Sequence, residues 1–484
     1  MAYTADDDKL FLTDAQHEQS AIRTARAQAL ADRGAPIQLA SKPIAVAVRD
    51  SNGPNGREPE AWIAESGFVV RRLGLEFGKT RQVYRGHTGP VTSLAFHTAG
   101  VARKREVLIS GSWDKSFRVW DTQSKTHLST TVGHLDFVKA VHVVQSLGVL
   151  ITGSSDKDIR IWDLTPLDEL DIPALAAEAS ATTPTVPLPP PREGAAPPPA
   201  IPLRPLPCLL ALKAHTRPIE ILASYPLLEP LAEGELEDEV DVASRRKTGR
   251  VALVSADSMG ALKVWELWRE GESGVLKGEL RSEVRHHEGG IYDLTLSPEG
   301  ELWTASVDNS VLLSKLSLAS AAEKPVQMLR IPHPAQVRSV LPLNTTFPDA
   351  VHLVTGGSDE LLRVIDLSAS AALDPNAKRE AKREWRGLPL AASAAVEGCV
   401  RDIEAHTHEV VQLRAYTTCD ADGKAQRWLL SASLDGTLRR WRWPEVLTEA
   451  MDKVIVVKEV EDAPKESLLT EEEERELAEL MGDD

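Results

Sequence analysis

The chain has 484 residues, of which 42% are hydrophobic, and a formal net charge of -17 at pH 7. This length fits two or three domains or one large repeat architecture, and the composition is that of a soluble chain able to bury a sizeable core. The acidic balance disfavours broad binding to nucleic-acid phosphates. No run approaches the roughly 18 apolar residues of a membrane span, and the acidic start does not resemble a signal peptide. We therefore expect a protein of the cytoplasm, the nucleus or both.

The three cysteines are Cys208, Cys399 and Cys419. None of them stands at the paired spacing of a zinc or redox motif. We therefore expect no disulfide framework, no metal site and no cofactor.

The first predicted element is a helical extension over residues 1–35. Thr13 and Gln16 stand at capping-box spacing before an Ala-rich stretch that ends near Gly34. A short extended segment, Pro36–Ala40, follows it. Three strand-like runs come next, in "PIAVAVRD", "AWIAES" and "FVVRRLGLEFGKTRQVY".

The most informative feature is an internal repeat. The pair "GHTGPVTSLAF" and "VLISGSWDKSFRVWD", within residues 86–121, returns as "GHLDFVKAVHVV" and "VLITGSSDKDIRIWD" within residues 133–163. Four weaker copies follow, so six copies are readable. Each copy holds three short runs rich in Val, Ile, Leu and Thr, separated by Gly, Asp, Asn or Ser, and this pattern predicts strands joined by tight turns.

Three insertions and a tail interrupt or follow the repeats. Residues 165–206 are rich in Pro and Ala and predict an excursion without regular structure. Residues 227–250 and 371–398 predict charged insertions. Residues 461–484 predict an acidic helix or tail, and the sequence leaves open whether this tail or the Pro-rich insertion binds anything.

The repeats resemble the WD40 family, in which Gly-His precedes the first strand, Asp occupies a turn and Trp-Asp closes the third strand. The resemblance implies four-stranded sheets arranged as blades around a central channel. With the three runs before the first copy, we count seven blades. We therefore expect an all-β, seven-bladed propeller over residues 36–460, with short terminal helices. Pro36–Ala40 is the favoured segment for closing the ring, and Lys453–Val460 is the alternative.

The resemblance also assigns a structural role to four recurring residues in a blade. His before the first strand, Ser or Thr in the second, Asp in the turn and Trp in the third would form one hydrogen-bonded chain. Several such copies cannot all be active sites, so we interpret them as fasteners. The three complete sets are His87, Ser110, Asp114 and Trp120; His134, Thr152, Asp156 and Trp162; and His406, Ser431, Asp435 and Trp441.

Three of the middle blades depart from this pattern. Met259 replaces the turn Asp of the fourth blade, while Ser314 and Ile365 replace the Trp of the fifth and sixth. Because an unpaired buried polar group is costly, these departures predict softer middle blades.

Binding residues are expected on the face around the channel, which is the usual docking platform of this fold. The positions beside the opening Val or Ile of the first strand, and the residue before the turn Asp, should point there. Trp113 is the most informative of them, because a turn needs no large aromatic side chain. The residues expected to bind a partner are Thr92, Trp113, Phe137, Lys139, Glu220, Tyr292 and Arg338.

Three functions can be weighed on this basis. The favoured hypothesis is a non-enzymatic scaffold or adaptor that binds proteins or peptides on the channel face and through its insertions, as a subunit of a larger complex. The alternative is an RNA-associated or ribosome-assembly factor that uses the basic loops "VARKRE", "SRRKTGR" and "KREAKREWR". An enzyme is disfavoured, because the histidines outside the repeats form no recognisable catalytic pair. The partner and pathway cannot be read from the sequence.

Overall fold

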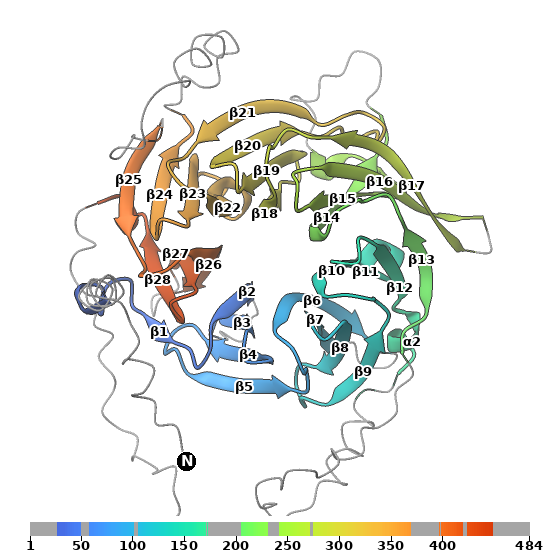
Figure 1. The fold of residues 1–484 in the computed structure, drawn as a ribbon, viewed down its shortest axis with the longest axis horizontal. Helices are drawn as coiled ribbons and strands as arrows, with labels where there is room; N and C mark the ends of the chain where they lie inside the picture. Colours follow the sequence, from blue (N-terminus) through green and yellow to red (C-terminus); the bar gives the residue numbers. More distant parts are fainter. Residues whose placement is uncertain are drawn as a thin grey trace, which may run out of the picture.

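The computed structural model describes residues 27–49, 58–100, 105–170, 172, 205–230, 242–271, 274–368, 396, 398–419 and 424–448. These residues form seven antiparallel sheets of four strands each, arranged as a ring around a central channel (Figure 1). The chain passes around the ring once, and the first strand of each sheet lies nearest the centre. The predicted seven-bladed propeller is therefore confirmed.

The blades follow one another in sequence order. The first contains β2 (Pro43–Arg49), β3 (Glu60–Glu65), β4 (Val69–Gly74) and β5 (Thr80–Arg85). The second contains β6 (Val91–Ala99), β7 (Arg105–Ser112), β8 (Ser116–Asp121) and β9 (His127–Val132). The third contains β10 (Val138–Val144), β11 (Val149–Ser154), β12 (Ile159–Asp163) and β13 (Cys208–Leu212). The fourth contains β14 (Ile219–Leu228), β15 (Lys247–Asp257), β16 (Leu262–Glu270) and β17 (Val275–Val284).

The remaining blades have the same plan. The fifth contains β18 (Ile291–Leu296), β19 (Glu301–Ser306), β20 (Ser310–Lys315) and β21 (Val326–Pro332). The sixth contains β22 (Val337–Pro342), β23 (His352–Gly357), β24 (Leu361–Asp366) and β25 (Cys399–Glu404). The seventh combines β26 (Val410–Cys419), β27 (Ala425–Ser433) and β28 (Thr437–Trp443) with β1 (Ile37–Gln38). The short helices are α2 (Thr165–Asp168), η2 (Gln145–Leu147), η3 (Val242–Ser244), η4 (Leu343–Thr345) and η6 (Glu445–Leu447).

The ring is closed by the N-terminal strand. Ile37 of β1 stands opposite Leu438 of β28, and the backbone N–H of Leu39 donates to the Gly436 carbonyl at 2.9 Å. Ile37 is only 7% exposed and packs with Val46 and other core residues of the first and seventh blades. The seventh blade thus joins the two ends of the ring and covers the edge of β28. The alternative segment, residues 453–460, lies outside the described residues.

The hydrophobic core lies mainly between neighbouring blades. Phe117 of the second blade packs edge-on against Trp162 of the third, with ring centroids 5.2 Å apart. Each middle strand is hydrogen-bonded to a strand on either side, and each of its faces packs against a neighbouring blade. In β11, for example, every residue is buried. This burial explains why the second strands read as continuous apolar runs rather than alternating ones.

Two predicted insertions need correction at their ends. Leu227 and Leu228 are buried residues of β14, and Lys247–Asp257 is strand β15, so residues 227–250 are partly blade. The start of the 165–206 insertion forms α2, and Leu167, together with Leu206 at the far end, packs into the core. These apolar residues anchor the insertions because burying them removes apolar surface from water.

Much of the predicted insertions and both chain ends lie outside the described residues. This applies to residues 1–26, 173–204, 231–241, 369–395 and 449–484, which include the acidic tail. Residues 27–29 are helical and Leu30 is buried. Arg439 of β28 donates to the Leu30 carbonyl at 2.6 Å. The last turn before residue 35 therefore packs against the closing blade.

Candidate functional site at the channel mouth

The innermost strand of every blade carries a β-bulge at the same place. In β6 the pairing with β7 passes from Val91 to Ser93, and the intervening Thr92 has no partner opposite it. The same interruption occurs in the other six blades. A bulge redirects a side chain out of the regular alternation. The seven residues that are skipped are Ile44, Thr92, Lys139, Glu220, Tyr292, Arg338 and Val411.

All seven bulge residues line one cavity of about 560 Å³ in the central channel. Trp113 lines it too, because the turn between β7 and β8 lies at the same end of the blade as the loop before β6. We call this end of the propeller the mouth face: it consists of the turns between second and third strands and the loops that precede the first strands. Six of the seven predicted binding residues therefore lie around one opening, and Phe137 stands at its edge.

Among the cavity residues that sequence reasoning missed are two further bulge residues and two polar residues of the seventh blade. Ile44 and Val411 occupy bulge positions but read as ordinary strand residues, since Ile and Val are common in strands. Gln412 and Arg414 lie deeper, on β26. The repeat spacing could have identified Ile44 and Val411, because each follows the residue of its own blade that is equivalent to Val91.

The exposed feature of the mouth face is a pair of aromatic rings. Trp113 and Phe137 stack with their centroids 5.0 Å apart and their planes 18° apart, although Trp113 is 43% exposed and Phe137 is 38% exposed. Their backbones are fixed: the Trp113 N–H donates to the Pro90 carbonyl at 3.0 Å, and the Phe137 carbonyl accepts from Ser155 at 2.9 Å. The blades thus hold two large apolar side chains where water reaches them.

The charged residues of the cavity wall are paired with each other. Lys139 and Glu220, on neighbouring blades, form an ion pair of 2.5 Å. Arg338 lies over the Tyr292 ring, with 3.9 Å from the guanidinium carbon to the centroid, and pairs with Glu409 at 2.5 Å. These side chains therefore join the third blade to the fourth, and Arg338 of the sixth blade joins the fifth to the seventh. Because these charges are paired within the protein, they offer little unpaired charge to a binding partner.

Deeper in the channel, a polar chain links the fifth, sixth and seventh blades. The Asp293 carboxylate accepts from Ser339 Oγ at 2.7 Å and from the Val340 N–H at 3.0 Å. Ser339 Oγ accepts from the Leu413 N–H at 2.9 Å. Arg414 donates to the Leu413 carbonyl at 2.7 Å, and burial lowers the pKa of its guanidinium while nearby Asp293 raises it. This chain holds the inner strands in register.

The three predicted polar sets each form one hydrogen-bonded chain. In the second blade, Trp120 Nε1 donates to Ser110 Oγ at 3.0 Å, and Ser110 Oγ lies 2.8 Å from His87 Nε2. His87 Nδ1 lies 2.7 Å from Asp114 Oδ2. Because the carboxylate can only accept, Nδ1 donates to Asp114, and Nε2 is engaged by the serine hydroxyl.

The sets of the third and seventh blades have the same geometry. His134 lies 2.9 Å from Asp156 and 2.7 Å from Thr152, which accepts from Trp162 at 2.8 Å. The corresponding distances among His406, Asp435, Ser431 and Trp441 are 2.9, 2.8 and 2.9 Å.

These contacts shift the acidity of the turn carboxylates. Burial raises the pKa of Asp114, but the hydrogen bond from His87 and further donors outweigh it, and the net pKa lies below the ordinary range. The same balance lowers the pKa of Asp156 and Asp435. Both ring nitrogens of each histidine are thus engaged, and the carboxylates are ionised hydrogen-bond acceptors. This arrangement stabilises the blade and leaves no free general base.

The fourth blade differs from the sequence prediction. Met259 does occupy the position of the turn Asp, but Asp257, two residues earlier, supplies a carboxylate 3.3 Å from His215 Nδ1. Ser255 completes the chain, 2.7 Å from His215 Nε2 and 2.9 Å from Trp265 Nε1. The network is therefore complete, because the turn lets Asp257 bring its carboxylate to the histidine from two residues earlier. The missing turn Asp thus gives no reason to expect a softer fourth blade.

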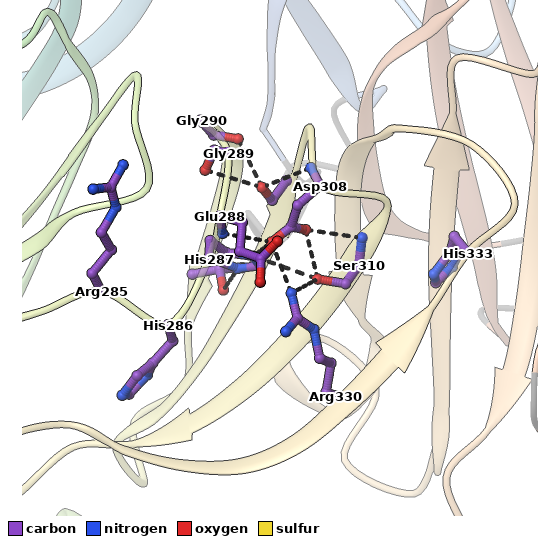
Figure 2. A network of polar contacts seen from close by, with 12 residues as sticks. Arg285, His286, His287, Glu288, Gly289, Gly290, Asp308, Ser310, Arg330 and His333 are labelled. Atoms are coloured by element: carbon purple, nitrogen blue, oxygen red, sulfur yellow. Dashed lines mark hydrogen bonds and ion pairs between the residues drawn. The ribbon is translucent and has the colours of Figure 1, made fainter. Parts of the chain in front are cut away.

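The fifth blade lacks the Trp, as predicted, but adds a cation. His287 contacts Asp308 at 2.9 Å and Thr304 at 2.8 Å. Arg330 from the outer strand β21 donates to Asp308 at 2.9 Å and to Ser310 at 3.2 Å. Figure 2 shows Arg330 reaching into this network, whereas Arg285, His286 and His333 lie outside it. The additional guanidinium gives the turn carboxylate a partner on its exposed side.

The first and sixth blades use other polar contacts. In the sixth, His333 contacts Thr355 at 3.0 Å, but Asp359 pairs with Arg363 instead of the histidine. Ile365 fills the Trp position and is buried. In the first blade, buried Glu65 accepts from Ser41 at 2.5 Å and pairs with Arg71. An ion pair therefore replaces the histidine network there.

Metal and membrane features can be assessed for the described residues. Among them, no group of His, Cys, Asp and Glu is arranged to hold a metal ion. None of the helices in the described part of the chain is long and apolar enough to cross a membrane.

Three segments of the chain are similar to a known family of repeats. The family model "WD domain, G-beta repeat" matches residues 78–121, 125–163 and 278–313. The three matched segments end in the third strands of the second, third and fifth blades, and each includes the histidine and the turn Asp of its blade.

Relatives extend the likeness beyond the matched repeats. An uncharacterized WD repeat-containing protein of Schizosaccharomyces pombe is 23% identical over 456 residues, which cover 93% of this chain and 92% of that protein. COMPASS component SWD3 of Saccharomyces cerevisiae is 35% identical over 80 residues, 16% of this chain and 24% of that protein. A periodic tryptophan protein 2 homolog of Schizosaccharomyces pombe is 35% identical over 63 residues, 13% of this chain and 7% of that protein. The chain carries repeats that match the WD40 family model, and its described residues build a seven-bladed β-propeller.

Proposed function

We propose that this protein is a non-enzymatic scaffold or adaptor that binds a protein or peptide partner on its mouth face, as a subunit of a larger complex. The observation that carries the proposal is the exposed stack of Trp113 on Phe137 beside the channel cavity. Large aromatic side chains dominate the energetics of protein interfaces, because they bury much apolar area at little entropic cost. The insertions between strands offer further surfaces for the same complex.

The surrounding chemistry supports binding rather than catalysis. In the blades with a complete network, the His–Asp pairs are tied to Ser or Thr and to Trp, so these histidines have no ring nitrogen left for a substrate. The charges of Lys139 and Glu220 in the cavity wall are paired with each other, and the charge of Arg338 is paired with Glu409. An enzyme would need converging groups with unmet hydrogen-bonding capacity.

The RNA hypothesis has less support from the contacts of the basic loops. In "SRRKTGR", Arg246 pairs with Glu229 and Arg250 pairs with Glu266. In "VARKRE", Arg105 pairs with Asp121. Phosphate contacts depend on free cationic side chains, and these three are already paired with carboxylates. Residues 101–104 of "VARKRE" and the whole of the third loop, "KREAKREWR", lie outside the described residues.

The relatives agree with the proposal at a general level. One of them is named as a component of COMPASS. That name concerns the relative, and we take from it only that a propeller with similar repeats serves as a complex subunit.

The proposal is tested by removing the aromatic pair. The tagged full-length protein and a Trp113→Ala, Phe137→Ala variant are purified from cells of the source organism, and the bound proteins are compared by mass spectrometry. We expect the variant to lose at least one stoichiometric partner and to keep its thermal stability, because both side chains are exposed.

The matched control is Phe77→Ala, since Phe77 is 58% exposed but lies in the turn between β4 and β5, at the opposite end of the blade. This variant should retain all partners. Identical partner sets for all three proteins would refute binding at the mouth face.

A further inference from the structure

We infer that one half of the mouth face recognises an acidic peptide segment that carries a bulky apolar side chain. The inference rests on the proposed function and names the chemistry of the partner. It comes from the distribution of exposed side chains around the ring, which is uneven in both charge and hydrophobicity.

The exposed apolar side chains of this face gather on the first four blades. Besides the Trp113–Phe137 stack, Leu135 in the loop before β10 is 79% exposed. Phe68, in the turn between β3 and β4, and Met259, in the turn between β15 and β16, are also exposed. Scattered single apolar residues need no explanation, but a stacked pair with a neighbouring leucine is an anchor site.

Exposed cations surround the same side chains. Lys115 and Lys157 occupy equivalent turn positions of the second and third blades, with φ of 68° and 75°. Lys42 precedes the first blade and Arg217 precedes the fourth, and both are exposed. Within the described part of the chain, no ion pair is formed by any of these four side chains.

The other half of the face has the opposite charge. Glu360 occupies the sixth-blade turn position that corresponds to Lys115, and Glu288 precedes the fifth blade and is exposed. Carboxylates within the basic half have partners: Asp136 Oδ1 accepts the Phe137 N–H at 2.9 Å, and Asp158, beside Lys157, pairs with Arg160 and Lys213. The face therefore has a basic, aromatic half over the first four blades and an acidic half beyond them.

A second cavity of about 300 Å³ extends the basic half toward the fifth blade. It is lined by Arg217, Met259 and Arg285, among others. Arg285 holds its position by donating from Nε and Nη2 to the Met259 carbonyl at 2.9 and 2.6 Å. The two carboxylates of this cavity are engaged, Asp257 by His215 and Glu283 by Lys263. The two arginines thus remain the available charges.

Charge and hydrophobicity together select the partner. The whole protein carries -17, so it repels acidic molecules in general, and a local basic region can attract them only where it is concentrated. An apolar side chain inserted beside Trp113 would bring flanking carboxylates to Lys115 and Lys157. RNA fits this surface less well for two reasons. Trp113 and Phe137 stack on each other, so one face of each ring is not accessible to a nucleotide base. The acidic half would also repel a phosphate backbone that crossed the mouth face.

The test is selection from a displayed library of random peptides on the immobilised full-length protein. We expect the selected peptides to be enriched in Asp and Glu together with Leu, Phe or Trp. A synthetic consensus peptide should bind the Lys157→Glu, Arg217→Glu variant about tenfold more weakly, a loss of about 1.4 kcal/mol, and should bind more weakly as salt is raised.

The matched control is Lys125→Glu. Lys125 is exposed and has φ of 62°, like the turn lysines, but it lies between β8 and β9 at the opposite end of the blade. This variant should bind the consensus peptide as the unsubstituted protein does.

The other outcomes separate this inference from the proposed function. Peptides without acidic enrichment that nevertheless lose binding on Trp113→Ala would overturn the acidic specificity and leave the mouth face as the site. Peptides that bind the Trp113→Ala variant unchanged, or no enrichment at all, would overturn both. Displacement of the consensus peptide by a homopolymeric RNA that itself depends on Lys157 and Arg217 would assign the basic half to nucleic acid instead.

Discussion

At the scale of single residues, the polar networks depend on where a group stands in space rather than on its position in the motif. Asp257 provides in the fourth blade what Asp114 provides in the second, although it stands two residues earlier in the turn. It also accepts from the N–H groups of Met259 and Ala261 at 2.9 and 3.0 Å. The carboxylate therefore satisfies a histidine and two backbone donors together.

Replacing this carboxylate should destabilise the fourth blade. We expect Asp257→Ala to lower the free energy of unfolding by about 2 kcal/mol, because it leaves His215 and two backbone N–H groups without their acceptor. Met259→Ala, in the same turn, should change it by less than about 0.5 kcal/mol, since that side chain is exposed. Urea unfolding of both variants measures the difference, and equal effects would show that the network of this blade contributes nothing.

At the scale of elements, two features position the site. The β-bulge repeated in all seven inner strands turns one side chain per blade toward the channel, and the closing strand β1 keeps those strands in one ring. The bulge residues are not paired with the neighbouring strand, so their chemistry can vary without disturbing the pairing within a blade. In this chain several of them also contact the next blade, as Lys139 and Glu220 do.

The closing strand offers a matched pair of substitutions on its two faces. We expect Ile37→Asp to destabilise the protein by about 3 kcal/mol or more, because it removes a buried apolar side chain and buries a carboxylate. It should also expose the edge of β28 and promote self-association. Gln38→Asp, on the exposed face of β1, should do neither. Thermal unfolding and size-exclusion chromatography test this, and two variants that behaved alike would speak against closure by β1.

At the scale of the whole molecule, two histidines that are partly or fully buried, His142 and His333, make the propeller sensitive to acid. Burial lowers the pKa of His142 to about 4, from an ordinary 6.5, and lowers the pKa of His333 to about 4 as well, against a raising contact from the Ile331 carbonyl. The unfolded chain therefore binds more protons than the folded one between about pH 6.5 and pH 4. Stability falls as the pH drops through this window.

This linkage predicts a lower thermal midpoint at pH 4.5 than at pH 7. In His142→Gln, the difference between the two midpoints should shrink, because a group that protonates in the unfolded state has been removed. The contact of His142 Nε2 with Ser224 Oγ at 2.8 Å can be kept by the glutamine amide. An unchanged difference would mean that His142 titrates normally in the fold.

The fold was largely predictable from the chain itself. Short strands at regular spacing define each blade locally, because each repeat carries its own turn residues, and in the second, third, fourth and seventh blades a complete polar chain adds to them. Prediction from the sequence failed where the role of a residue depends on its position in the fold rather than on its position in the repeat. Asp257 was overlooked because its position is unlike that of Asp114, and Leu228 was assigned to an insertion although it completes a strand.

The candidate site was predictable in part for the same reason. Thr92, Lys139 and the other bulge residues follow from the repeat register, but the sequence could not show that Lys139 and Glu220 neutralise each other, or that Arg338 pairs with Glu409. Those pairs join different blades and depend on how neighbouring blades face each other. Similarly, Trp113 stood out as an aromatic in a turn, while its stacking on Phe137 required the second and third blades to be placed side by side.

The amino-acid sequence alone determined the blade, since hydrogen bonding within a sheet, turn chemistry and the polar chains act over a single repeat of some forty residues. Only the tertiary structure decided the surface: which bulge charges cancel, which aromatic rings remain exposed together, and that the cations of the mouth face gather over the first four blades. The physical reason is that those properties arise between blades, where side chains from distant segments meet, and no local pattern encodes which neighbour each will find.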